Sequence, residues 1–378
     1  MKASVALGMT GFSLIAVTYG MARFSWGLML PAVMRDIPFS PRLAGVISAC
    51  SFAAYCLSII CASVLAERFG PRLPAAAAAF CAAAGLLLLA LSFSPGMLAA
   101  GLFIAGLSPG LASPSLAAAV SRVIAVSRQP LVNTIINAGT GAGIILSVPV
   151  LIFLPGGWRM ACVVFGLAAL TCLVPVIRYL PSGCQNISME KKSWRETLLR
   201  RQLARLAIIA FVSGMASAAW WSFGPDVLRH HSGVDEKITS LLWLASGGAG
   251  ILGALTGPAV AYTGLNQVYR ISQLCMAAPL MLLAFSPGFS WWFFPAVALC
   301  GAGYVTLSGV LLVCGASAAQ DAPASGVGVV FFMMAAGQAA GSVIFGLLYA
   351  QTGAAPALAA FSVLSVLMMF LPPSKNGR

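Results

Sequence analysis

The chain has 378 residues, of which 60% are hydrophobic and only 8% are charged, and its mean hydropathy is +0.97. In soluble domains about a quarter of all residues are charged, so this composition excludes a soluble globular protein. The formal net charge of +13 would suit a nucleic-acid-binding protein, but the basic residues fall between long apolar segments, which is typical of membrane topology. We therefore expect one integral membrane unit and no nucleic-acid partner.

Windows of about 20 apolar residues, the length of helix that crosses a bilayer, predict twelve membrane-spanning helices. The apolar runs are continuous and lack the alternation of barrel strands, so we expect an all-α membrane protein. The longest polar connection divides six spans from six, which predicts an N-terminal six-helix bundle at 1–180, a cytoplasmic linker at 181–201 and a C-terminal six-helix bundle at 202–378. In chain order the spans are expected near 7–33, 43–65, 73–93, 96–119, 131–154, 158–179, 204–226, 239–262, 268–286, 290–314, 325–350 and 355–372.

The basic residues also predict the orientation of the chain in the membrane. If the N-terminus is cytoplasmic, fifteen of the 21 Lys and Arg residues lie in inner segments, five lie in outer segments, and Arg23 alone lies within a span. The positive-inside rule therefore predicts that both termini and the linker are cytoplasmic. The first span is too long for a cleaved signal peptide, and the flanking Arg35-Asp36 carries no small-residue cleavage pattern.

The two halves of the chain repeat each other at an offset of 194 residues. The sequence Gly-Met-Ala at 20–22 recurs at 214–216, which predicts two pseudo-symmetric halves. A repeat of this length is a duplicated multi-helix unit rather than a solenoid repeat. Duplicated hydrophobic halves usually meet at a binding site near the middle of the bilayer. Arg23 in the first half falls opposite Ser217 in the second, so this position is the first candidate for substrate chemistry.

The connection after the second span carries the most specific motif of the chain. Residues 63–72 read Ser-Val-Leu-Ala-Glu-Arg-Phe-Gly-Pro-Arg. This segment resembles the G-x-L-a-D-r-x-G-r-k signature of the major facilitator superfamily, with Glu67 in place of the usual Asp and Ser63 in place of the first Gly. The second copy, at 257–264, keeps the glycine spacing but has lost the charges. A weaker similarity, through residues 19–24 and the following Leu30-Pro31, points to the bacterial YbfB/YjiJ-like group.

Resemblance to this superfamily implies a secondary transporter in the cytoplasmic, or inner, membrane of a bacterium, whose two six-helix bundles alternate access to a central site. It also implies that the signature is a conformational latch on the cytoplasmic side, formed by Glu67, Arg68, Gly70 and Arg72. A carboxylate at Glu67 can cap a helix N-terminus, and the arginines can reach acidic groups or lipid phosphates. The latch would bias a conformational equilibrium rather than touch the substrate.

Arg23 lies deep in the first predicted span. Twelve residues separate it from Arg35 at the outer boundary, or about 18 Å of helix. At that depth the guanidinium must face protein or a water-filled cavity. Six of the eight acidic residues lie in loops, Glu67 belongs to the latch, and Asp226 lies at the outer end of the seventh span. A substrate or coupling role for Arg23 and a structural pairing with an acid or with backbone carbonyls both remain open. Asp226 is the candidate for proton coupling.

Further substrate-binding candidates come from helical spacing and from the repeat. Helical spacing places Tyr19 and Trp26 on the face of Arg23, and the superfamily resemblance puts spans one, four, seven and ten along the central path. Polar amides within spans need partners, which neighbouring helices supply about as often as ligands do. The expected substrate-binding residues are Arg23, Tyr19, Trp26, Ser217, Trp220, Trp221, Asn137, Tyr304 and Gln338.

The fifth span contains a glycine-rich segment, Gly139-Thr140-Gly141-Ala142-Gly143, with Pro149 beyond it. The segment resembles the antiporter motif of exporters, but Ile144 occupies the place of the proline that normally follows the second conserved glycine. Close helix packing explains such a pattern of small residues without any direction of transport.

The sequence does not predict an enzyme, a metal centre or a cofactor site. Both histidines lie in one outer loop, no lysine lies within a span, and there is no G-x-x-x-x-G-K-[ST] phosphate loop. We expect a monomeric transporter whose partners are a small-molecule substrate and the lipid bilayer. The favoured substrate is a small organic anion bound near Arg23, because a guanidinium can bind a carboxylate with two hydrogen bonds. The alternatives are an exporter of apolar drugs or neutral metabolites with a structural Arg23, and a non-transporting receptor or scaffold.

Overall fold

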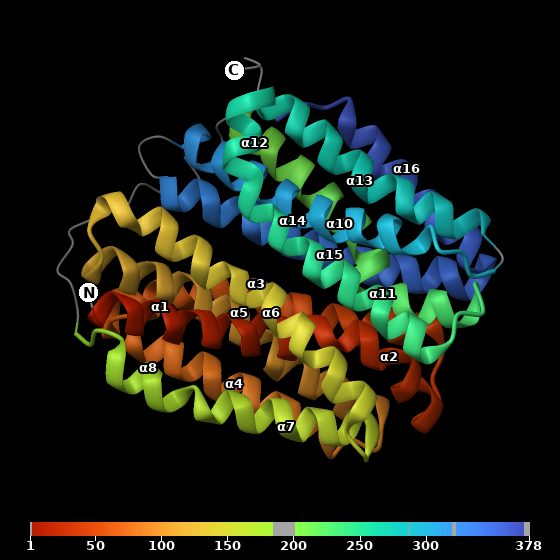
Figure 1. Cartoon of the computed structure of the whole chain (residues 1–378), viewed down its shortest axis with the longest axis horizontal. Coiled ribbons are helices and arrows are strands. Elements are labelled where there is room, and N and C mark those ends of the chain that lie inside the picture. Colours follow the sequence, from red (N-terminus) through yellow and green to blue (C-terminus); the bar gives the residue numbers. More distant parts are fainter. Residues whose placement is uncertain (1, 184–200, 287, 320–322, 374–378) are drawn as a thin grey trace. The chain divides into compact units, whose positions relative to one another are not determined.

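The computed structural model describes residues 2–183, 201–286, 288–319 and 323–373 (Figure 1). Every regular element in these ranges is a helix and none is a strand, so the expectation of an all-α protein is confirmed for them. Most of the linker expected at 181–201 lies outside the described residues. The chain divides into two compact units, Met1–Phe39 with Cys50–Ile187 and Ser40–Ala49 with Ser188–Arg378.

Each unit is a set of long helices joined by short connections. The elements up to the end of the first unit are α1 (Lys2–Ile15), η1 (Ala16–Phe24), α2 (Ser25–Asp36), α3 (Pro41–Phe69), α4 (Arg72–Ala90), α5 (Pro95–Val123), η2 (Val126–Arg128), α6 (Gln129–Phe153), α7 (Gly157–Thr171) and α8 (Leu173–Tyr179). Those that follow are α10 (Arg201–His230), α11 (Glu236–Ala249), η3 (Gly250–Leu255), α12 (Thr256–Thr263), α13 (Leu265–Phe285), α14 (Phe293–Ala318), α15 (Pro323–Thr352) and α16 (Ala354–Met369).

Ten helical runs in the described part of the chain are long and apolar enough to cross a membrane, beginning with the continuous run Ser4–Asp36. The α11 and α12 region forms an eleventh candidate, which is broken by a bend of 60°. α16 has 16 residues, about 24 Å of helix, and is therefore shorter than a hydrocarbon core of roughly 30 Å. The described residues thus contain ten or eleven candidate spans where the sequence predicts twelve.

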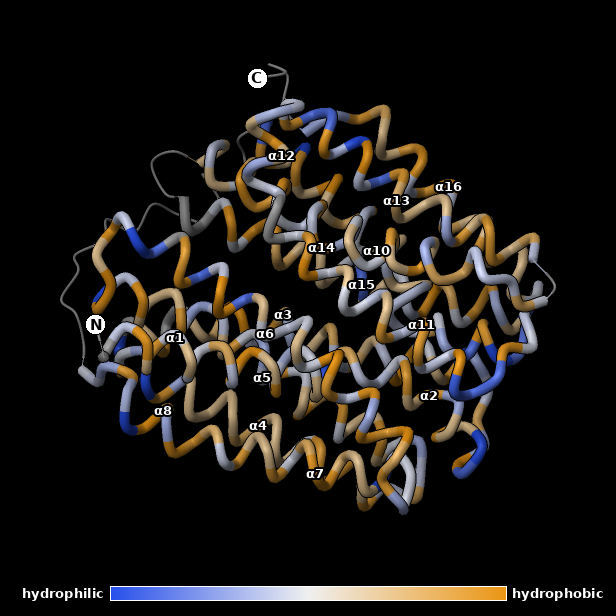
Figure 2. Tube along the Cα trace, viewed as in Figure 1, coloured by the Kyte–Doolittle hydropathy of each residue, from blue (hydrophilic) through white to orange (hydrophobic). Residues whose placement is uncertain are grey.

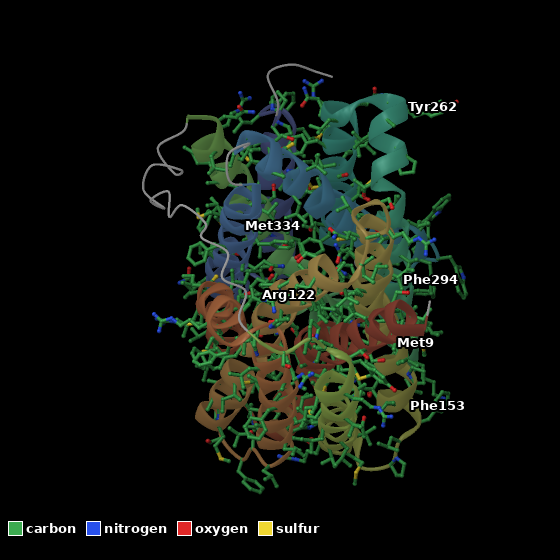
Figure 3. All side chains as sticks on the ribbon, turned by 90° about the vertical axis from the view of Figure 1, so that its left-hand side faces the viewer. Met9, Arg122, Phe153, Tyr262, Phe294 and Met334 are labelled. Carbon is green, nitrogen blue, oxygen red and sulfur yellow. The ribbon has the colours of Figure 1, made fainter. Side chains whose placement is uncertain are left out.

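The distribution of apolar side chains fits helices that are surrounded by lipid. Figure 2 shows hydrophobic residues along most of the helix length in both units, with the strongly hydrophilic residues gathered mainly near helix ends and in connections. Large apolar side chains such as Met9, Phe153 and Tyr262 are exposed on the outside of the helices (Figure 3). Apolar surface of this extent is expected where the surrounding solvent is hydrocarbon rather than water.

The first span is not a uniform α-helix. A π-helix, η1, covers Ala16–Phe24 between α1 and α2, and it carries Arg23 in its last turn. π-Helical turns are rare, and they occur frequently at functional sites. The regular α-helical spacing assumed from the sequence therefore does not hold here, and residues on the two sides of η1 are rotated relative to a uniform α-helix.

Two glycines of the glycine-rich segment bring α6 close to α1 and η1. A Cβ atom on Gly139 would lie 2.3 Å from the carbonyl oxygen of Phe12, and one on Gly143 would lie 2.2 Å from that of Ala16. No side chain fits at these distances, so both positions require glycine. Close helix packing therefore accounts for these two glycines, and an exporter's antiporter motif is not needed to explain them.

The same kind of contact occurs between α10 and α15 in the second unit. A Cβ atom on Gly337 would lie 1.9 Å from the carbonyl oxygen of Phe211, and one on Gly341 would lie 2.4 Å from that of Met215. Here too, the two glycines are four residues apart and contact two carbonyl groups four residues apart. Tight backbone packing therefore holds α15 against α10, and several buried polar side chains lie along this interface.

Candidate functional site

Arg23 is buried among aromatic rings in the first unit. Its side chain is on η1 and the residue is only 7% exposed. The guanidinium carbon lies 4.2 Å from the ring centroid of Tyr55 and 4.9 Å from that of Phe52, both on α3. The rings of Phe24 and Tyr19 lie at 5.4 Å and 5.8 Å. All four distances are within the range of a cation–π interaction, so these residues form what we call the Arg23 cage.

Hydroxyl groups connect the cage to a third helix. The hydroxyl of Tyr19 lies 3.1 Å from that of Tyr55 and 2.9 Å from Oγ of Ser113 on α5. These contacts join η1, α3 and α5 beside a buried cation. The rings stabilise the positive charge through their faces, whereas the N–H groups of a guanidinium point outward in its own plane. Such a site combines a cation, aromatic surface and hydroxyl groups within one unit.

The sequence identifies only part of this cage. Arg23 and Tyr19 are expected from the sequence and lie together, whereas Phe52 and Tyr55 are not expected. The available signal was that Phe52 and Tyr55 are large aromatic residues three positions apart on one face of the second span. Of the other expected residues of the first half, Trp26 is buried on α2 and Asn137 is exposed on α6.

A second polar cluster surrounds Gln338 in the second unit. Gln338 is 1% exposed on α15, and its Nε2 donates hydrogen bonds to Oγ of Ser217 at 3.2 Å and to the hydroxyl of Tyr304 at 3.1 Å. Ser217 lies on α10 and Tyr304 on α14, so one amide joins three helices. A buried amide that reaches two hydroxyl groups is stabilised well enough to persist in an apolar bundle.

Tryptophan rings pack beside the Gln338 cluster. The ring centroid of Trp221 lies 5.4 Å from those of Tyr304 and Trp243, and the centroid of Trp220 lies 5.7 Å from that of Trp243. Nε1 of Trp220 donates a hydrogen bond to Oγ of Ser246 at 2.9 Å. The five residues that the sequence selects in this half, Ser217, Trp220, Trp221, Tyr304 and Gln338, therefore come together in one unit.

The sequence does not identify Trp243, Ser246 or Gln273, which extend this region. Gln273 is fully buried on α13, and its Nε2 donates to Oγ of Ser213 at 2.7 Å and to the hydroxyl of Tyr269 at 3.2 Å. Trp243 and Ser246 lie on the eighth span, which is not one of the spans that the superfamily resemblance assigns to the central path. Their position could be read only from the fold.

Asp226 is a buried carboxylate near the C-terminal end of α10. The residue is 2% exposed, and its Oδ1 lies 3.0 Å from Nδ1 of His230, one turn further along the helix. Its carboxylate also accepts a hydrogen bond from the hydroxyl of Tyr349 on α15. The neighbouring Arg229 forms a separate ion pair with Glu236, with 3.3 Å between Nη1 and Oε2. Asp226 is therefore a buried carboxyl group held between an imidazole and a phenol.

The signature segment packs against the end of α8. Gly70 has φ +78°, in the left-handed region, and a Cβ on it would lie 2.5 Å from the carbonyl oxygen of Gly183. Nε of Arg72 donates to the carbonyl oxygen of Leu180 at 2.8 Å, and Nη1 of Arg122 donates to that of Gly183 at 2.8 Å. Arginines that bind the last carbonyls of a helix also stabilise its dipole.

These contacts show what part of the expected latch does within one unit. Gly70 and Arg72 hold the chain that follows α8, and Arg68 is exposed. The side chain of Glu67 lies outside the described part of the structure. A latch role for the four residues stays a prediction.

The family follows from comparison of the whole sequence. The model of the Major Facilitator Superfamily matches residues 12–342. The chain belongs to the major facilitator superfamily. It is therefore a multi-span membrane transporter and not an enzyme, as the signature at 63–72 indicates.

Solved structures with this fold include a nucleoside transporter. The crystal structure of a point mutant of the nucleoside transporter NupG has a TM-score of 0.79 and 13% identity, and the match covers 96% of this chain and 98% of that one. A second NupG crystal structure has a TM-score of 0.72 and 16% identity, and covers 98% of each chain. At such identities the likeness concerns the fold alone.

Proposed function

We propose that this protein is a secondary transporter that moves a small organic anion across a bacterial cytoplasmic membrane by alternating access. The proposed architecture has twelve spans in two pseudo-symmetric bundles, 1–180 and 202–378, joined by a cytoplasmic linker at 181–201, with both termini cytoplasmic and a monomeric chain. The similar glycine contacts of α6 and α15 support the duplication. The bent α11–α12 region and the short α16 supply the eighth and twelfth spans.

The observation that carries the anion proposal is the buried guanidinium of the Arg23 cage. An arginine in the middle of a span is costly to maintain, and such residues usually serve a function. A carboxylate can pair with a guanidinium through two parallel hydrogen bonds, while the surrounding aromatic rings stabilise the positive charge. The rings would also pack against the apolar part of an aromatic or aliphatic acid.

A second candidate is a neutral solute with a planar polar ring, such as a nucleoside. The Gln338 cluster favours it, because an amide beside Trp221 and Tyr304 offers hydrogen bonds and ring-stacking surface without a charge. The two NupG structures with this fold are described as a nucleoside transporter, which is consistent with this candidate. In that case Arg23 would tie helices together through its ring contacts, as it would in an exporter of apolar or neutral compounds.

A binding assay separates the two candidates. The purified protein is heated with benzoate, with its neutral analogue benzamide, or with uridine, and the shift in unfolding temperature is measured. The anion proposal predicts stabilisation by benzoate but not by benzamide, weaker in Arg23→Lys and absent in Arg23→Ala. Stabilisation by uridine that persists in Arg23→Ala and disappears in Gln338→Leu would instead support the nucleoside candidate.

The coupling candidate and the latch are parts of the same proposal. We expect Asp226 to take part in any proton coupling, since its carboxylate is buried in a span and contacts a titratable imidazole. We expect the segment with Glu67, Arg68, Gly70 and Arg72 to bias the conformational equilibrium, since Arg72 binds a backbone carbonyl at the end of α8 rather than a side chain in the span.

A further inference from the structure

Three polar contacts cross the interface between α10 and α15. Five of the six side chains involved belong to buried residues, although the glycine contacts of α15 already hold these two helices together. Hydroxyl and amide pairs commonly link membrane helices, whereas an ionisable side chain within a span is costly and usually serves a function. The three pairs are Ser217 Oγ with Gln338 Nε2 at 3.2 Å, the hydroxyls of Ser222 and Ser342 at 2.9 Å, and Asp226 with Tyr349 through a side-chain hydrogen bond.

We call these six residues the α10–α15 seam. On α10 its members, Ser217, Ser222 and Asp226, are spaced by five and four residues, so neighbouring pairs lie about 6 to 8 Å apart along the helix. One end of the seam is the Gln338 cluster, and the other end is the carboxylate of Asp226. The seam therefore connects a candidate substrate-binding region with a buried carboxyl group.

The exposed His230 contacts the buried Asp226 and links it to water. Among the acidic side chains that the structure describes, Asp226 is the only buried one. The side chain of His230 is 61% exposed, and its Nδ1 lies 3.0 Å from Oδ1 of Asp226. The same Nδ1 lies 3.2 Å from the backbone carbonyl oxygen of Asp226, so the imidazole contacts both the backbone and the carboxylate of this residue. An exposed imidazole can exchange protons with water near neutral pH, and from this position it can pass a proton to a carboxylate that water does not reach.

We propose that the His230–Asp226 pair binds the proton that drives transport, and that it takes this proton from the outer side of the membrane. This rests on the proposed function, because the orientation of the chain puts His230 on the outer side. The imidazole takes a proton from water, and its Nδ1–H bond then breaks as an O–H bond forms on the Asp226 carboxylate. The products are a neutral imidazole and a neutral carboxylic acid. The proton belongs to the coupled pair rather than to either residue.

Loss of the proton changes the cost of burying Asp226. When the pair holds a proton, the negative charge of the carboxylate is balanced. The proton lies either on the imidazole, which is then an imidazolium, or on the carboxylate itself. When the proton leaves, a carboxylate remains buried with the hydroxyl of Tyr349 as its partner in the seam, and a charge buried in this way is unfavourable. The proton thus favours an arrangement in which Asp226 is buried against α15, and its release favours one in which Asp226 meets water.

Few other charges face this pair. On α10, Arg229 is paired with Glu236 of α11, and His231 belongs to none of the ion pairs seen among the described residues. α15 contributes Tyr349, and α16 has no acidic or basic side chain. Among the described residues, the halves of α13 and α14 near the C-terminal end of α10 offer the thiols of Cys275 and Cys300 and the hydroxyl of Tyr304. α11 has Lys237 and the N-cap Asp235, and the Ser40–Ala49 segment has the exposed Arg42.

The first test measures stability as a function of pH, with protons as the only ligand. His231→Gln is the matched control, because the chain has two histidines and they are adjacent. The unfolding temperature of the wild type and of His231→Gln should fall as the pH rises through about 6 to 8, where an imidazole loses its proton. His230→Gln and Asp226→Asn should be flat over that range. Identical pH profiles in the wild type and in either of these two variants would overturn the proposal.

A third variant keeps the test informative if Asp226→Asn does not fold. Tyr349→Phe preserves the ring but removes the hydroxyl that bonds the carboxylate. Its stability should fall more steeply with pH than that of the wild type, because the deprotonated carboxylate loses the hydrogen bond from Tyr349. An unchanged slope would contradict the proposed role of the seam.

The second test measures proton binding without any substrate. Vesicles that contain the purified protein are adsorbed on a solid-supported membrane, and a pH jump is applied to one side. The wild type and His231→Gln should give a transient charge movement that falls to the background of protein-free vesicles in Asp226→Asn. A transient of wild-type size in Asp226→Asn would refute proton binding by the pair. A failure of the transport proposal itself would appear differently, as the absence of solute flux in the wild type.

Discussion

The Arg23 cage predicts a measurable coupling between Arg23 and Tyr55. The guanidinium carbon lies 4.2 Å from the ring centroid of Tyr55, and Arg23 is 7% exposed. A desolvated cation–π pair of this kind contributes about 2 kcal/mol, against roughly 0.5 to 1 kcal/mol for an exposed one. A double-mutant cycle of Arg23→Met and Tyr55→Leu should therefore give a coupling free energy of about 1 to 2 kcal/mol.

The assay is the reversible unfolding of the purified protein by SDS in mixed micelles. Tyr55→Phe is the matched control, because it keeps the ring beneath the guanidinium and removes only the hydroxyl bonded to Tyr19. Its coupling to Arg23 should remain close to that of tyrosine. The equivalent cycle with Tyr19, whose ring lies at 5.8 Å, should give a smaller coupling. Additivity of Arg23 and Tyr55 within about 0.5 kcal/mol would refute the cation–π interpretation.

Three further predictions concern Arg23, a glycine of the α10–α15 interface and the signature segment. Arg23→Lys should weaken binding of an organic anion while the fold is retained, and Arg23→Ala should weaken it further, as measured by thermal shift; wild-type affinity in both variants would exclude Arg23 as the anion site. Gly341→Ala should destabilise the protein by about 1 to 3 kcal/mol because its Cβ would meet a carbonyl oxygen at 2.4 Å, whereas Gly328→Ala on the same helix, where nothing lies within 4 Å, should not. Glu67→Gln should slow transport and shift cysteine accessibility between the two faces without changing ligand affinity within each state, and unchanged turnover and accessibility would contradict the latch.

Much of the fold could be predicted because a span is recognised from its own residues alone. The first span was expected at 7–33, and a continuous apolar run covers Ser4–Asp36. The predicted number of spans exceeds the ten or eleven candidates of the described residues for two local reasons. Hydropathy windows do not register the 60° break between α11 and α12, and they extend α16 beyond its 16 helical residues.

The candidate site was harder to predict because its parts come from spans that are distant in sequence. The first span by itself predicts Arg23 and Tyr19 but not Tyr55, which lies 36 residues from Tyr19 and meets it only in the folded bundle. The π-helix around Arg23 has no signal in the hydropathy pattern, so α-helical spacing was assumed. Gln338, in contrast, can be proposed from the sequence because an amide in the middle of an apolar span needs a partner, and its partners Ser217 and Tyr304 are also among the residues that the sequence predicts.

The central claim, that this protein transports a small organic anion through a site that contains Arg23, is tested most directly by solute flux. Vesicles containing only the purified protein and lipid are loaded with unlabelled benzoate, and counterflow of labelled benzoate is followed, with labelled uridine and benzamide measured in parallel. The account predicts saturable benzoate counterflow in the wild type that is absent from protein-free vesicles, has a raised half-saturation concentration in Arg23→Lys and is lost in Arg23→Ala. Uridine counterflow without benzoate counterflow, or benzoate counterflow unaffected by Arg23→Ala, would contradict it.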